Sequence, residues 1–198
     1  MANGAVNKME DIPDGLKALM GRATGKDAKL PPVETWNPPF CGDLDIRIAG
    51  DGSWFYLGSP IGRKPLVKLF ASVLRKDADG KHYLVTPVEK IGITVDDAPF
   101  LAVEMVREGT GEDAVLTLRT NLGEVVCIGP NHPLRFEAEQ EHDGFKPYVL
   151  VRGRLEALFT RALMYDLAEI LEERPAAGGG GTGVWSQGVF FPVPAELL

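Results

Sequence analysis

The chain has 198 residues, 44% of them hydrophobic and 25% charged, which is typical of a folded protein with a substantial core. Its formal charge of -7 and the absence of any Lys/Arg run argue against nucleic acid and against anionic membranes, and we expect neither as a partner. The start of the chain lacks a basic, apolar leader and no later stretch approaches a membrane span, which predicts a cytoplasmic protein. Cys41 and Cys127 are isolated and predicted to be free thiols, and no metal or cofactor is expected.

The first half of the sequence predicts strands around one short helix. Residues 1–30 carry a weak helical signal and are interpreted as an N-terminal helix or arm. Alternating apolar residues at 44–48 and 54–57 flank a glycine-rich turn, which predicts a β-hairpin. Apolar residues at helical spacing between 66 and 74 then predict an amphipathic helix, and a second hairpin-like region follows at 82–95.

The second half predicts more strands and one long helix. Short apolar segments between 116 and 151 are separated by Gly, Asn, Pro or Asp, as in antiparallel sheets. Helical spacing over 155–173 predicts a long helix that ends before Pro175, and the following glycine run is interpreted as a linker. Residues 184–191 are expected to form a last strand or hairpin.

The expected fold class is therefore α+β, mostly β. It consists of two related antiparallel β-rich units at 31–106 and 107–198, with one short helix in the first and the long C-terminal helix closing the second.

The two halves show weak internal similarity. When the sequence is aligned with itself, one shift pairs Gly52 with Gly123 and Gly58 with Gly129. Slightly shorter shifts pair Asp79-Gly80 with Asp143-Gly144, and Tyr83 with Tyr148 together with the residues that follow each tyrosine. These matches favour a duplication, with chance similarity of turn residues as the alternative.

Several segments together resemble a bacterial family, domain-of-unknown-function family 1285. They are WNPPFCGDLDI at 36–46, DGSWFYLGSPIGR at 51–63, LVTPVEK at 84–90, TNLG at 120–123 and PYVLVRGRLEA at 147–157. The resemblance covers residues 31–193. It implies a duplicated β-rich core, a second half loosely similar to pleckstrin-homology folds, a site between the halves for a nucleotide-like ligand, and a role in signalling.

Arginines supply the clearest candidates for a binding site. Arg63 ends a glycine-rich turn ahead of the first helix, where a guanidinium and free helix-terminal N–H groups suit an anion. Arg152, Arg154 and Arg161 cluster near the last helix, where Arg161 and Tyr165 share one stripe with Arg154. A solvated loop and ordinary ion pairs are the alternatives. The whole candidate ligand-binding set is Arg63, Trp54, Tyr56, Thr86, Glu89, Asn121, His132, Arg152 and Arg161.

These residues predict a non-catalytic protein that binds a small anionic or nucleotide-like ligand between its halves. For Trp54 and Tyr56, core packing is the alternative to ligand stacking. Two other functions remain open: a hydrolase in which Glu89 or His132 activates water, and a protein-interaction scaffold. No acid/base pair is recognisable, so the sequence favours binding over catalysis, and it does not indicate an oligomeric state.

Overall fold

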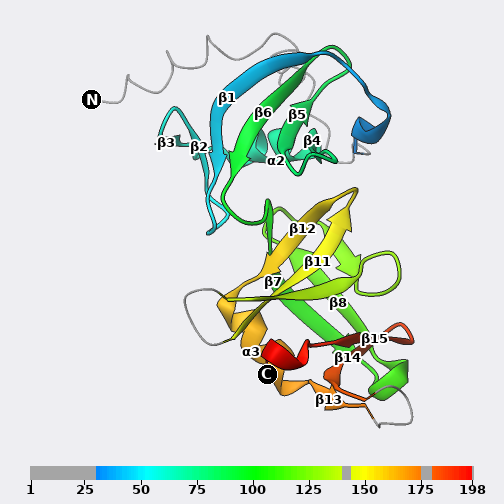
Figure 1. The fold of residues 1–198 in the computed structure, drawn as a ribbon. Helices are drawn as coiled ribbons and strands as arrows, with labels where there is room; N and C mark the ends of the chain where they lie inside the picture. The colour runs from blue at the N-terminus through cyan, green and yellow to red at the C-terminus, as the bar shows by residue number, and fades with distance from the viewer. Residues whose placement is uncertain (1–29, 140–143, 175–179, 198) are drawn as a thin grey trace. The chain divides into compact units, whose positions relative to one another are not determined.

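The computed structural model describes residues 30–139, 144–174 and 180–197, so the predicted N-terminal helix and most of the glycine run lie outside the described residues. The chain forms two compact units (Figure 1). The first runs to Ile48 and continues over Ser53–Thr94, and the second contains Ala49–Gly52 and the chain from Val95. No helix in the described part is long and apolar enough to span a bilayer.

In its described residues, the first unit is one six-stranded sheet with one α-helix, α2. Its strands lie in the order β3-β2-β1-β6-β5-β4. The elements are η2 (Val33–Thr35), β1 (Phe40–Ile48), β2 (Trp54–Tyr56), β3 (Ser59–Pro60), α2 (Lys64–Ser72), β4 (Leu74–Lys76), β5 (His82–Val85) and β6 (Lys90–Val95).

The predicted first hairpin and short helix are both present, for the expected reasons. The turn between β1 and β2 contains Gly52 at φ +79, where a residue with a Cβ would be strained. Ile48 pairs with Trp54 across the hairpin, and both side chains are buried. Helix α2 has a proline in its first turn and buries Phe70, which stacks on Trp54. The hairpin and the helix therefore share one core.

The described part of the second unit is a six-stranded sheet, one α-helix and a small C-terminal sheet. The strand orders are β10-β11-β12-β7-β8-β9 and β13-β14-β15. The elements are β7 (Phe100–Glu108), η3 (Gly111–Asp113), β8 (Val115–Thr120), β9 (Val125–Cys127), β10 (Leu134–Ala138), β11 (Phe145–Arg152), β12 (Leu155–Phe159), α3 (Arg161–Glu169), β13 (Glu172–Glu173), β14 (Thr182–Ser186), β15 (Val189–Pro192) and η5 (Ala195–Leu197).

The small sheet contains the C-terminal hairpin that the sequence predicts, and a buried serine ties it to the large sheet. Ser186 accepts a hydrogen bond from the Leu116 N–H at 2.9 Å and donates one to the Ile128 carbonyl at 2.7 Å. Helix α3 contacts β7 and β12 of the large sheet (Figure 1).

Three expectations need correction. Residues 155–173 do not form one long helix: Leu155, Ala157 and Phe159 alternate as buried residues of strand β12, and α3 begins only at Arg161. The boundary expected between 106 and 107 falls inside β7, whose strand partners all belong to the second unit. The second sheet is also not wholly antiparallel, because β12 pairs with β7 in parallel.

The two units have the same strand topology. Numbered within each unit, the first sheet reads 3-2-1-6-5-4, and the second reads the same when taken from its β9 edge. Each sheet therefore consists of two three-stranded meanders joined through their first and last strands. In the second unit this junction is the parallel pair β7 and β12. In the first unit the Lys90 N–H donates to the Pro39 carbonyl at 3.1 Å, which brings the starts of β6 and β1 together. The chain is therefore internally duplicated, as predicted.

Only part of the predicted sequence register survives. Tyr83 and Tyr148 both lie on fifth strands, in agreement with the alignment that pairs them. Arg75 pairs with Tyr83, and Arg135 pairs with Tyr148 in the same way on the fourth strands. The alignment of Gly52 with Gly123 is wrong, because the turn at Gly52 joins the first and second strands whereas the turn at Gly123 joins the second and third.

Candidate functional site

Most of the predicted site residues in the first unit pack in the core or stabilise a turn. Trp54 and Tyr56 are buried, at 2% and 9% exposure, so their rings pack in the core. Thr86 is also buried, and its Oγ1 accepts the N–H groups of Val88 at 3.2 Å and Glu89 at 3.0 Å, which stabilises the turn before β6. Arg63 is exposed just before α2, and Glu89 is half-buried in the turn that Thr86 stabilises.

In the second unit, Asn121 and His132 hold backbone segments together. The Asn121 side-chain oxygen accepts the Leu101 N–H at 3.1 Å, which connects the β8–β9 turn to β7. The His132 Nδ1 lies 2.9 Å from the Leu150 carbonyl, so this nitrogen carries the proton and joins the segment before β10 to β11. Both contacts use polar atoms that a ligand would otherwise need.

Arg152 and Arg161 differ in their partners. The Nε of Arg152 lies 3.2 Å from a carboxylate oxygen of Glu124, and its guanidinium lies 5.4 Å from the centre of the Phe100 ring. Arg161 is exposed on the first turn of α3 and donates from Nε to the hydroxyl of Tyr165 at 3.3 Å. No carboxylate in the described part of the chain forms an ion pair with Arg161. Of these two arginines, Arg161 is therefore the better placed for an external anion.

Arg161 lines a cavity of about 330 Å³ in the second unit. The cavity lies where the start of β11 and the end of β12 meet α3, and its charged residues are Glu139, Lys146 and Arg161. Its apolar and aromatic lining comes from Pro147, Leu158, Phe159, Met164 and Tyr165. A mostly apolar cavity of this size with a few charged groups is typical of a small-molecule site.

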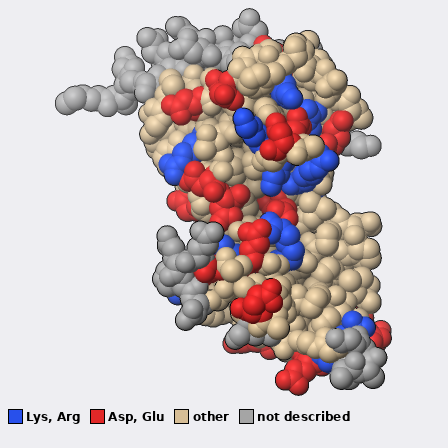
Figure 2. Space-filling view, viewed as in Figure 1, with Lys and Arg blue, Asp and Glu red and all other residues tan. Residues whose placement is uncertain are grey.

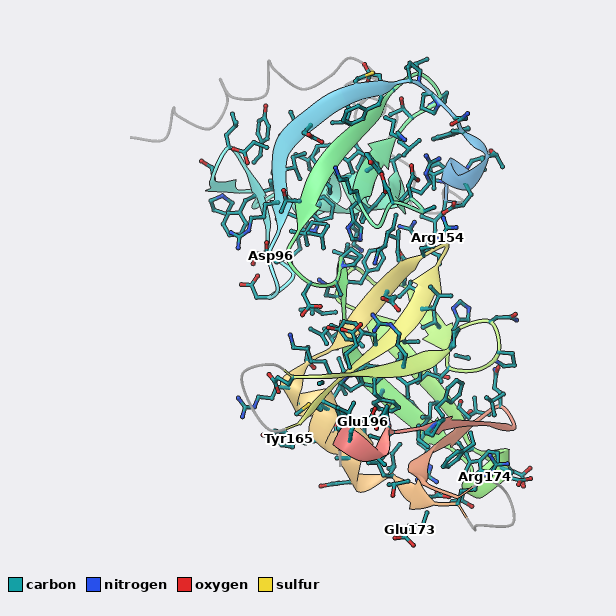
Figure 3. The ribbon with its side chains drawn as sticks, viewed as in Figure 1. Asp96, Arg154, Tyr165, Glu173, Arg174 and Glu196 are labelled. Carbon is teal, nitrogen blue, oxygen red and sulfur yellow. The ribbon has the colours of Figure 1, made fainter. Side chains whose placement is uncertain are left out.

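Tyr165 and Arg161 are four residues apart on α3, so their side chains lie on the same side of the helix. Tyr165 is 55% exposed at the cavity, which leaves its ring available to a ligand. The predicted stripe of Arg154, Arg161 and Tyr165 is wrong in one member. Arg154 lies in the β11–β12 turn, and Figure 3 shows it at the other end of the hairpin from Tyr165.

Lys146 brings a second positive charge to the cavity, but it is already paired. Its ammonium lies 2.9 Å from Asp97, and the other oxygen of Asp97 accepts the hydroxyl of Tyr148 at 2.7 Å. The hydrogen bond to Asp97 raises the pKa of Lys146 above its ordinary value, so Lys146 stays protonated at neutral pH. Asp97 therefore fixes both the position and the charge of Lys146.

Acidic and basic side chains lie interspersed on the face of the molecule shown in Figure 2. No group of three or more His, Cys, Asp or Glu side chains that could hold a metal ion occurs within residues 30–139, 144–174 and 180–197. The cavity beside α3 is the described site that contains a predicted binding residue, Arg161.

Comparison with known proteins identifies the family. One family model, described as the N-terminal domain of a domain of unknown function (DUF1285), matches residues 31–98, and a second, described as the C-terminal domain of the DUF1285 protein, matches 99–193. A solved DUF1285 family protein from Silicibacter pomeroyi DSS-3 is 45% identical, with a TM-score of 0.80 over 88% of this chain and 93% of that one. The chain belongs to the DUF1285 family.

A second solved DUF1285 protein, from Shewanella baltica OS155, is more distant. It is 27% identical, with a TM-score of 0.52 over 65% of this chain and 94% of that one. No curated protein matches the chain. Membership in DUF1285 therefore supports the duplicated two-unit fold and leaves the function to be argued from the site.

Sequence reasoning found Arg161 but missed its neighbours in the cavity. Lys146 and Glu139 lie on β11 and just after β10, two segments that come together only through strand pairing. The spacing of Arg161 and Tyr165 was a local signal. No comparable signal in the sequence connected Lys146 with Arg161, because they lie on separate elements.

Proposed function

We propose that this DUF1285 protein binds a small organic ligand through an anionic group, in the cavity between α3 and the β11–β12 hairpin. The observation that carries the proposal is Arg161, an exposed guanidinium without a carboxylate partner among the described residues, at a cavity lined by apolar side chains. Its planar array of donors suits carboxylates and phosphates.

Because the protein is negatively charged overall, binding of an anion must depend on a cationic group at the site itself. The chain carries a formal charge of -7, so its overall field repels anions at long range. An anion is then held only where local cationic donors outweigh that field. Arg161 provides such donors, and Lys146 adds a charge that Asp97 partly neutralises.

The lining suggests what else the ligand contains. Met164 and Leu158 offer apolar surface, and the exposed ring of Tyr165 offers a face for stacking. A ligand with an anionic group and a planar or apolar body fits this lining, and nucleotide-like molecules belong to that class. Binding without turnover, with a role in signalling, is the function we assign to the site.

A thermal-shift screen of small carboxylates, phosphates and nucleotides, followed by calorimetry of the hits, tests the proposal. Arg161→Leu should weaken the hits by about tenfold or more, because a charge-assisted contact is lost. Arg154→Leu is the matched control, since it removes the same charge at the other end of the β11–β12 hairpin. Equal affinities in the parent and in Arg161→Leu would refute the proposal.

A further inference from the structure

The cavity beside α3 contains a negative charge as well as a positive one. Glu139 follows directly after β10 and is half-buried, and its N–H donates to the Gly144 carbonyl at 3.1 Å. The Glu139 side chain lines the same cavity as Arg161. Within the described residues, no donor hydrogen-bonds to the Glu139 carboxylate.

The third charge of the lining is already compensated. Lys146 lies 2.9 Å from Asp97, so this pair presents little net charge to a ligand. Among the described residues, the charges of the lining without an ion-pair partner are the guanidinium of Arg161 and the carboxylate of Glu139, which attract each other only weakly. A purely anionic ligand would gain from Arg161 and be repelled by Glu139, whereas a ligand with both signs of charge would gain from both.

The apolar lining lies alongside these two charges. Pro147, Leu158, Phe159 and Met164 come from β11, β12 and α3. A methionine sulfur and an aromatic ring favour an aromatic body over a polar one. The cavity thus combines one positively charged group, one negatively charged group and an apolar wall.

We infer that the ligand is zwitterionic and has an apolar or aromatic body, as in an aromatic amino acid. Its carboxylate binds Arg161, its ammonium binds Glu139, and its body packs on Leu158 and Met164. The inference rests on the proposed function, because it takes the same cavity as the binding site. Glu139 becomes the residue that distinguishes a zwitterion from a simple anion.

Three probes that share one phenylethyl body test this inference by calorimetry: L-phenylalanine, its des-amino counterpart 3-phenylpropionate, and the cation phenethylamine. L-phenylalanine should bind at least about tenfold more tightly than either of the others, since only it pairs with both charges. Glu139→Gln should weaken L-phenylalanine by about tenfold and leave 3-phenylpropionate as tight or tighter. Glu137→Gln is the matched control, because Glu137 pairs with Arg135 and does not line the cavity.

The outcomes separate this inference from the proposed function. If 3-phenylpropionate binds as tightly as L-phenylalanine, or if Glu139→Gln weakens both alike, the zwitterion is excluded while Arg161-dependent anion binding stands. Absence of L-phenylalanine binding to the folded parent also overturns the inference. If no anion in the wider screen depends on Arg161, the proposed function fails as well. Thermal unfolding of Glu139→Gln checks that the variant is folded.

Discussion

Arg75 offers the sharpest test of how the first unit is held together. It is 7% exposed on β4 and donates from Nη1 to the carbonyls of Val33 at 2.8 Å and Trp36 at 2.7 Å. Its Nε and Nη2 donate to the two carboxylate oxygens of Asp77 at 2.6 Å and 3.2 Å. One side chain therefore fixes the segment around η2 to the sheet.

Replacing Arg75 with leucine should cost about 3 to 5 kcal/mol of unfolding free energy. The substitution leaves two carbonyls without their donor, each worth about 1 to 3 kcal/mol where water cannot replace it, and leaves Asp77 with Lys90 as its remaining cation. Burial raises the pKa of Asp77, but hydrogen bonds from Arg75 and Lys90 outweigh it and hold this pKa below its ordinary value. In the variant, the pKa of Asp77 should lie closer to its ordinary value.

The duplication supplies a matched control. Arg135 lies opposite Tyr148 as Arg75 lies opposite Tyr83, and it pairs with Glu156, but its side chain is 40% exposed. Arg135→Leu should cost only about 1 kcal/mol, because solvent screens the pair and hydrates the partners left behind. Hydrogen exchange of peptides from each unit gives the two free energies separately. A loss in Arg75→Leu no larger than in Arg135→Leu would refute this reasoning.

Two further predictions concern a buried histidine and the two thiols. Burial, and secondarily the charge of Lys76, lower the pKa of His82 from 6.5 to about 4, so the unfolded chain takes up this proton first as the pH falls. The first unit should lose stability between about pH 6.5 and 4, by up to about 3 kcal/mol, and urea unfolding of His82→Leu should lack this acid-dependent loss. For the thiols, Cys41 is exposed and Cys127 half-buried, so a thiol reagent should modify Cys41 first in the folded protein, and both in urea. Equal rates in the folded state would contradict the described burial.

The first hairpin and α2 could be predicted because their signals are local. Gly52 lies in the turn between two alternating segments. The apolar residues around Phe70 keep a helical spacing over 66–74, which does not fit a strand. The prediction of one helix over 155–173 was wrong because the deciding signal is not local. The apolar residues of 155–159 fit a helical stripe and an alternating strand equally well, and the choice was made by pairing with β11 and with β7, which lies far earlier in the chain.

The candidate site was predictable to the same extent. Arg161 and Tyr165 are neighbours on one helix, so their spacing was informative, whereas Glu139 and Lys146 join them only once β10, β11 and β12 pair. Trp54 and Tyr56 show the limit of residue type as a guide. Aromatic residues serve both cores and binding surfaces, and their burial here follows from pairing with Ile48 and Ile46. The pleckstrin-homology likeness of the second half stays a prediction.

The connectivity of the duplicated units explains why the cavity belongs to one of them. In the first unit the helix precedes the fourth strand, and only Asp96 to Pro99 separate the sixth strand, β6, from β7, which is too short for a helix. In the second unit the sixth strand, β12, runs directly into α3, so the first residue of that helix, Arg161, lies beside the strand ends of β11 and β12. Asp97 in the short connection holds Lys146 at the same place. In the described residues, the charged cavity of the second unit thus forms where a helix follows the last strand of the sheet, and moving Arg161 one residue along α3 would turn its side chain by about 100° away from that cavity.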